Sequence, residues 1–101
     1  MKKTYRTFSD FFPFYMEQHK DRRNRRLHFV GSLAVLAILF WALLSQQWLL
    51  LMAMPVAGYG FAWIGHFFFE KNQPATFQYP IYSLMGDWVM FWHILTGRLQ
   101  F

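Results

Sequence analysis

The sequence has no cysteine and little charge: Asp, Glu, Lys and Arg make up 15% of its 101 residues. Without cysteine, disulfides, zinc–thiolate centres and a cysteine nucleophile are excluded. Phosphate-binding glycine loops and nucleophile-elbow motifs are also missing. Instead, 55% of the residues are hydrophobic and 23% are aromatic. A soluble chain this short could not bury so much apolar surface, so we expect residues 1–101 to form a single membrane domain.

Basic residues gather near the start of the sequence. Eight of the ten lysines and arginines fall within the first 26 residues, namely Lys2, Lys3, Arg6, Lys20, Arg22, Arg23, Arg25 and Arg26. Because apolar segments follow, this region indicates membrane orientation and contact with anionic lipid headgroups rather than a nucleic-acid site. We therefore expect membrane lipid as a partner, no nucleic acid, and a cytoplasmic N-terminus. The membrane would be the inner membrane of a bacterium or the endoplasmic reticulum of a eukaryote.

The spacing of apolar residues predicts an all-α integral membrane protein. Residues 5–20 read as an amphipathic helix that could lie in the membrane interface, and its aromatic stripe includes His19. Residues 27–44 and 48–69 are long and apolar enough to be transmembrane helices. Residues 81–97 form a third, less hydrophobic membrane helix, which could span the bilayer, re-enter it or lie in the interface.

Small and polar residues predict how these helices begin and pack. Asn24 is the expected N-cap of the helix at 27–44. Gly58, Ala62 and Gly65 recur at helical spacing in the second transmembrane helix. Another helix could approach closely along this face, so a homo-oligomer is one expectation.

Two transmembrane helices would bring His19, His28, His66 and Glu70 to the cytoplasmic end of the bilayer. Imidazoles bind iron, copper and zinc, and two histidines with one carboxylate hold the metal in non-haem Fe(II) oxygenases. His66 and Glu70 are four residues apart, so they could share a metal or only hydrogen-bond to each other. His28 could equally be solvated at headgroup level. His19 and His28 would point about 180° apart on one continuous helix, so a shared metal requires a break at residues 21–24.

Asp87 is expected inside the third helix, where a buried carboxylate needs a partner. It could be a metal ligand, a base, or the counter-charge of an arginine in the basic turn, and a structural role is favoured. His93 lies six residues further on and faces elsewhere. We expect His93 to be an interfacial aromatic residue rather than a ligand.

Three stretches of the sequence resemble the signature of one protein family. They are FYMEQH at 14–19 with NRRLHFVG at 24–31, YGFAWIGHFFFEKNQPATF at 59–77, and YPIYSLMGD at 79–87. They resemble the small membrane proteins related to the fungal 2-hydroxy fatty acid dioxygenase of phytosphingosine breakdown. The resemblance extends from about residue 11 to residue 97.

This resemblance implies an Fe(II)-dependent dioxygenase that shortens 2-hydroxy fatty acids by one carbon, which is an α-oxidation. The family's motif histidines are implied to hold the iron, and they match His19, His28 and His66. Among the acidic residues, Glu70 and Asp87 are the expected catalytic carboxylates.

The expected substrate would use the basic turn and the small-residue face. The substrate carboxylate would be held by the arginines of the turn, which are Arg22, Arg23, Arg25 and Arg26. The acyl tail would lie between the helices along Gly31, Gly58 and Ala62. The alternative is a non-enzymatic membrane protein that binds lipid or a partner helix, in which His66 and Glu70 would be structural.

Overall fold

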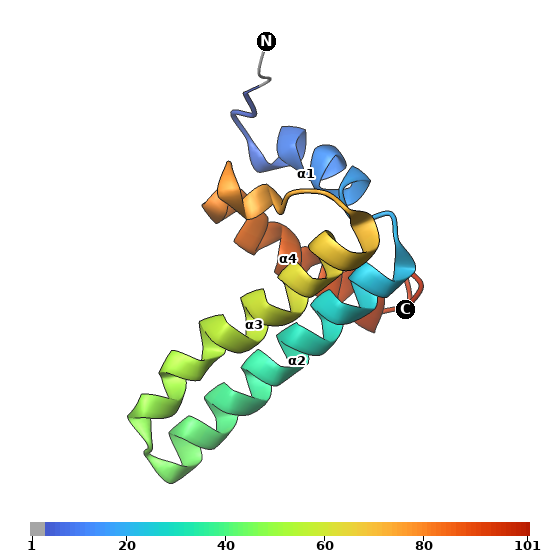
Figure 1. Ribbon diagram of the computed structural model, residues 1–101. Coiled ribbons are helices and arrows are strands. Elements are labelled where there is room, and N and C mark those ends of the chain that lie inside the picture. The colour runs from blue at the N-terminus through green and yellow to red at the C-terminus, as the bar shows by residue number, and fades with distance from the viewer. Residues whose placement is uncertain (1–3) are drawn as a thin grey trace.

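The computed structural model describes residues 4–101, and this part of the chain is helical with no strand (Figure 1). Lys2 and Lys3 of the predicted basic N-terminus lie outside the described residues. The elements are α1 (Phe8–Glu17), α2 (Arg22–Ser45), η1 (Trp48–Met52), α3 (Ala53–Ile64), η2 (Gly65–Glu70), η3 (Ala75–Phe77) and α4 (Pro80–Leu95). The prediction of an all-α membrane fold is confirmed.

The chain forms a long helical hairpin with α1 and α4 gathered at one end (Figure 1). The hairpin turns at Gln46, which adopts the left-handed conformation with φ 56° and ends α2. Two helical stretches, Arg22–Ser45 and Trp48–Glu70, are long and apolar enough to cross a membrane. Only 17% and 11% of their most apolar windows are buried by the chain itself. Their outward side chains therefore present an apolar surface of the kind that lipid covers.

The two arms of the hairpin approach closely where the sequence places small residues. A Cβ atom on Gly31 would lie 3.1 Å from the Cβ of Phe61, and one on Gly58 would lie 3.2 Å from Cγ2 of Val35. Ala62 is buried in the same face. The predicted close helix approach is confirmed, and the neighbouring helix is α2 of the same chain. A homo-oligomer stays a prediction, and it would need a different surface.

The second apolar segment is not one uniform helix. It begins with the 3-10 turn η1, continues as the α-helix α3, and ends with η2, which has π-helical hydrogen bonding. Lys71 closes η2 in the left-handed conformation, with φ 58°. The π-helical turn changes the spacing of side chains, because its hydrogen bonds join residues five apart.

The break between α1 and α2 lies earlier than predicted. The chain leaves the helix at Gln18, and the side chain of Asp21 accepts a hydrogen bond of 2.8 Å from the backbone nitrogen of Arg23. Asp21 is therefore the N-cap of α2, and the prediction of Asn24 as the cap is wrong. Asn24 lies inside the first turn of α2 and is fully buried. An aspartate three residues upstream provides the same capping oxygen.

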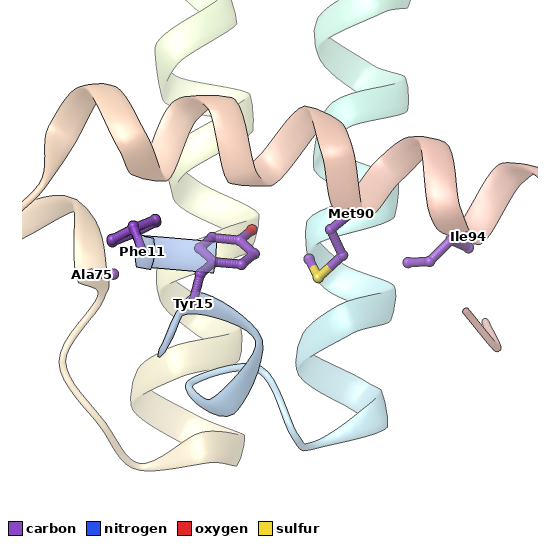
Figure 2. Close-up of a cluster of buried hydrophobic side chains, with 5 residues drawn as sticks. All are labelled: Phe11, Tyr15, Ala75, Met90 and Ile94. Atoms are coloured by element: carbon purple, nitrogen blue, oxygen red, sulfur yellow. The ribbon is translucent and has the colours of Figure 1, made fainter. Parts of the chain in front are cut away.

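The helix predicted at residues 81–97 is α4, and it packs across the end of the hairpin and holds α1 against it. Figure 2 shows α4 running crosswise to α2 and α3, with the side chains of the core between α4 and α1. This core consists of Phe11, Tyr15, Ala75, Met90 and Ile94. Burying a large aromatic or aliphatic side chain stabilises a fold by about 1.5–3 kcal/mol. The layer of α1 and α4 is thus a packed unit. Because α4 contacts both α1 and α2, it fixes the chain on both sides of the break that joins these two helices.

Candidate metal centre

Three buried histidines from separate parts of the chain converge at the end of the hairpin opposite the Gln46 turn. His19 follows α1, His28 lies in the second turn of α2, and His66 lies in η2. Their side chains are 1%, 6% and 2% exposed. One ring nitrogen from each lies within 4.8 Å of the other two, and Nε2 of His19 is 3.1 Å from Nε2 of His28.

The break at residues 18–21 allows this convergence. Reversal of the chain after α1 brings His19 over His28, although the two would point apart on a continuous helix. Arg25 holds the reversal, because its Nη1 donates to the carbonyl oxygens of His19 at 3.2 Å and Lys20 at 2.9 Å. The predicted chain reversal and the meeting of the three histidines are confirmed.

Hydrogen bonds on the other ring nitrogens fix the tautomer of each histidine. Nδ1 of His19 donates to the carbonyl oxygen of Tyr15 at 2.6 Å. Nδ1 of His28 donates to the carbonyl oxygen of Asn24 at 2.9 Å. Nδ1 of His66 donates to Oδ1 of Asn72 at 2.7 Å. Since these oxygens can only accept, every Nδ1 carries the proton and every Nε2 presents a lone pair.

The three histidines thus bring unprotonated ring nitrogens close together in a site from which water is largely excluded. Burial is the main cause that lowers the pKa of His19, and the nearby His28 and His66 lower it further. A neutral imidazole is the form that binds metals. Lone pairs this close repel one another unless a cation lies between them. The residues therefore fit a first-row transition metal with three protein ligands and open positions for other molecules.

Asn72 anchors His66, a role that the sequence pattern does not indicate. Its Nδ2 donates to the carbonyl oxygen and to Oε1 of Gln18, both at 3.1 Å, which leaves Oδ1 free to accept from His66. The left-handed conformation of Lys71 turns Asn72 back toward the histidine. Such partners orient metal-binding histidines and raise their basicity. Asn72 lies in the 59–77 block, but nothing in its spacing shows which histidine it contacts.

Glu70 does not point to the three histidines. Its Oε1 accepts hydrogen bonds from the backbone nitrogen of Asp21 and, at 3.4 Å, from Nδ2 of Asn24. Because η2 has π-helical hydrogen bonding, residues four apart are not aligned as they are in an α-helix. Glu70 therefore ties the end of η2 to the start of α2, and its catalytic role stays a prediction.

Asp87 lies close to the centre and is bound by Tyr15. The Tyr15 hydroxyl donates to Oδ1 of Asp87, and the Tyr15 ring stacks on the His19 ring with centroids 4.0 Å apart. Burial raises the pKa of Asp87 to about 7. A Cβ atom on Gly86 would lie 2.9 Å from the Tyr15 ring, so glycine leaves room for it. The buried partner of Asp87 is a tyrosine, not an arginine of the basic turn.

Two adjoining cavities connect this centre to an apolar cleft. The small cavity, of about 20 Å³, is lined by the three histidines together with Tyr15, Ser83 and Asp87, among others. The large cavity, of about 350 Å³, is lined by His28, Ser32, Val35, Met54, Pro55, Gly58, Tyr59, Ala62, Leu84, Asp87 and Trp88. His28 and Asp87 border both. Gly58 and Ala62 line the apolar cleft, whereas Gly31 packs against Phe61, and the path of an acyl tail stays a prediction.

The four arginines of the basic turn lie outside both cavities. Nε of Arg22 donates to the carbonyl oxygen of Phe101 at 2.6 Å, and the Arg26 guanidinium lies 5.1 Å from the Phe101 ring centre. Arg23 pairs with the capping aspartate at 2.9 Å, and Arg25 holds the chain reversal. Their contact with a substrate carboxylate stays a prediction, and none of the four arginines lines the cleft.

His93 lies away from the centre, where its ring meets the edge of the Phe12 ring at 6.0 Å between centroids. This contact agrees with the expected aromatic packing role. Within residues 4–101, the three buried histidines are the only cluster of histidine and acidic side chains with metal-binding spacing.

Comparison with known proteins places the chain in a family. A family model described as "2-hydroxy-palmitic acid dioxygenase Mpo1-like" matches residues 5–99. No curated protein and no solved structure matches the chain. Since the match covers nearly the whole sequence, the chain belongs to the Mpo1-like family.

Proposed function

We propose that this member of the Mpo1-like family is an Fe(II)-dependent dioxygenase that shortens 2-hydroxy fatty acids by one carbon. The family description, which names a 2-hydroxy-palmitic acid dioxygenase, supports the reaction class. The observation that carries the proposal is the convergence of His19, His28 and His66, which bring one ring nitrogen each to within 4.8 Å of one another while a hydrogen bond fixes every Nδ1.

The overall reaction balances with one molecule of O₂. The bond between C1 and C2 breaks, C1 leaves as CO₂, and C2 is oxidised to the new carboxyl group. The four electrons lost by the two carbons reduce O₂, and one water molecule forms. When bound by the three histidines, Fe(II) would supply the binding and reduction of O₂.

The protein's own residues would bind, orient and shield the reactants. Asn72 and the carbonyl oxygens of Tyr15 and Asn24 hold the imidazoles in one tautomer and orientation. The core between α1 and α4 excludes water from one side of the centre. The apolar cleft between α2, α3 and α4 would take the acyl chain, and it begins at His28, next to the histidine centre.

The substrate would reach the cleft from the membrane. Lining residues such as Pro55 and Leu84 are also exposed on the outer surface of the helices, where lipid would lie. With the basic turn in the cytoplasm, the histidine centre would lie near the cytoplasmic interface. The membrane would be the bacterial inner membrane or the endoplasmic reticulum.

The test is product formation by the purified protein. Protein purified under argon and loaded with Fe(II) is mixed with 2-hydroxypalmitate and air, and the fatty acids are analysed by mass spectrometry. We expect pentadecanoate, formed in step with O₂ consumption. His93→Ala, which alters a histidine outside the centre, should still form product, whereas His19→Ala, His28→Ala and His66→Ala should not.

Absence of the shortened acid from an iron-loaded wild type would contradict the enzymatic proposal. If the protein also contained less than one equivalent of metal, the alternative of a non-enzymatic membrane protein that binds lipid or a partner helix would take its place.

A further inference from the structure

Ser83 carries a buried hydroxyl group without a hydrogen-bond partner. The side chain is 3% exposed, and its Oγ bonds to no group within residues 4–101. Native proteins rarely leave a buried hydroxyl unpaired, because it has lost its hydrogen bonds to water. Ser83 lines the small cavity beside the three histidines. A polar ligand in this cavity would supply the missing partner.

Asp87 lies one helical turn beyond Ser83 on the same face of α4. Its Oδ1 accepts from the Tyr15 hydroxyl, and the carboxyl group makes no second hydrogen bond to the described residues. The Tyr15 ring is itself held between the His19 ring, on which it stacks, and the backbone of α4 at Gly86, where no side chain intervenes. Asp87 borders both the small cavity and the apolar cleft. The carboxyl group is therefore fixed at their junction, with one oxygen still able to accept.

The donor, the acceptor and the cleft together describe a ligand. The small cavity holds about 20 Å³, which suits a compact polar group and excludes a phospholipid headgroup. A hydroxyl that can donate and a carboxyl oxygen that can accept match a carboxylate with a neighbouring hydroxyl. The apolar cleft of about 350 Å³ continues from this point. A 2-hydroxy fatty acid, the substrate class of the proposed function, has a head and a chain of this kind.

We propose that Ser83 and Asp87 form the binding site for the polar head of the substrate. Ser83 donates to the substrate carboxylate, and Asp87 accepts from the 2-hydroxyl group. This inference rests on the proposed function and deepens it, because Asp87 becomes the residue that selects 2-hydroxy acids over unsubstituted fatty acids. A site built to hydrogen-bond a hydroxyl group discriminates strongly against an analogue that lacks it.

Equilibrium binding tests the site without turnover. The protein as purified is titrated in detergent under argon with 2-hydroxydecanoate or decanoate, and heat release gives each Kd. The wild type should prefer 2-hydroxydecanoate by about tenfold or more. Ser83→Ala should weaken both acids equally, by about tenfold to a hundredfold, since both have the carboxylate. Ser45→Ala, a serine at the far turn whose hydroxyl bonds to its own helix, is the matched control.

Asp87 is tested by its effect on the preference between the two acids. Asp87→Leu combined with Tyr15→Phe replaces the hydrogen-bonded pair by apolar groups, so no buried partner is left unpaired. This double variant should bind both acids with similar Kd values and keep its metal, which is measured to show that the histidine centre is intact.

The outcomes separate this inference from the proposed function. If the wild type binds neither acid, the proposed function fails, and the head site fails with it. If the wild type prefers the 2-hydroxy acid but folded Ser83→Ala binds both acids as the wild type does, the head site is wrong and the function stands. An unchanged preference in the Asp87 double variant would remove the selecting role of Asp87.

Discussion

The geometry of the histidine centre depends on hydrogen bonds to residues that would not touch a bound metal. Each imidazole would be a poor ligand if its ring could rotate or change tautomer. His19 and His28 use backbone carbonyl oxygens, which the helices fix, whereas His66 uses the side chain of Asn72. His66 is therefore the one histidine of the three whose ring orientation can be freed by substituting a single side chain, that of Asn72.

Asn72→Ala should weaken metal binding by about tenfold to a hundredfold, because His66 Nδ1 loses its acceptor. Metal affinity is measured by competition with a chelator of known affinity. Gln73→Ala alters the exposed neighbouring amide and serves as the control, which should bind as the wild type does. Equal affinity in Asn72→Ala would show that the Asn72 contact does not support the ligand.

Asp87 predicts a pH dependence of stability. Burial raises its pKa to about 7 from an ordinary value of 3.8, so the folded protein holds this proton more tightly than the unfolded chain. The resulting stabilisation is complete below about pH 4 and is lost as the pH rises through about 7. The melting temperature of Asp87→Asn minus that of the wild type should therefore rise as the pH increases from about 4 to about 7. Above about pH 7 this difference should stay constant.

Thermal unfolding in detergent at stepped pH measures this difference, and subtracting the wild type cancels the titration of the histidines. Glu17→Gln removes an exposed carboxylate and should show no such trend. A constant difference between Asp87→Asn and the wild type across the range would contradict the raised pKa.

At the scale of elements, the hairpin depends on small residues where α2 and α3 approach. Gly31→Leu should destabilise the fold by about 1–3 kcal/mol, because its Cβ would already lie 3.1 Å from Phe61 and the longer side chain must push the helices apart. Gly60→Leu is the matched control, since no atom lies within 4 Å of a Cβ at that position. Denaturation in mixed micelles compares the two, and equal stability would show that the helices do not pack as described.

Periodicity and length predicted the elements well, but not their ends. The apolar runs gave both long helices, and the nine-residue separation of His19 and His28 required the chain break. The cap at Asp21 instead of Asn24 was missed because both residues are good caps and only tertiary contacts decide between them. The π-helical turn has no distinct sequence pattern, so the direction of Glu70 could not be predicted.

The site was predictable where it depended on ligand chemistry and not where it depended on packing. Histidines carry a recognisable chemistry, so the three ligands could be proposed from the sequence. The roles of Ser83 and Asn72 follow from contacts between distant segments, which local spacing does not report. The substrate contact of the arginines stays a prediction, because their charge favours it, whereas the structure shows Arg22 bonded to the carbonyl oxygen of Phe101 and Arg25 bonded to the chain reversal.

At the scale of the whole molecule, the fold divides into an apolar hairpin and a polar end that carries the chemistry. An α2 of 24 residues is about 36 Å long, enough to cross the hydrocarbon core of a bilayer. The end of α1, the start of α2 and η2, which carry or adjoin the histidines, lie at the end of the hairpin away from its turn (Figure 1). A bilayer around the hairpin would therefore place the centre near one membrane surface.

The predicted orientation can be tested because the chain has no cysteine of its own. Gln73→Cys, in the loop at the histidine end, should react with a membrane-impermeant maleimide only from the cytoplasmic side. Gln47→Cys, at the opposite turn, should react only from the other side. Labelling of both from the same side would contradict a two-span topology, and the reverse pattern would contradict a cytoplasmic N-terminus.

The most direct test of the account is the metal content of the purified protein and its histidine variants, measured by mass spectrometry. The wild type and His93→Ala should each hold about one equivalent of a transition metal after loading with Fe(II). His19→Ala, His28→Ala and His66→Ala should each hold much less while remaining helical by circular dichroism. Unchanged metal content in these three variants, or none in the wild type, would contradict the claim that the three histidines form a metal centre.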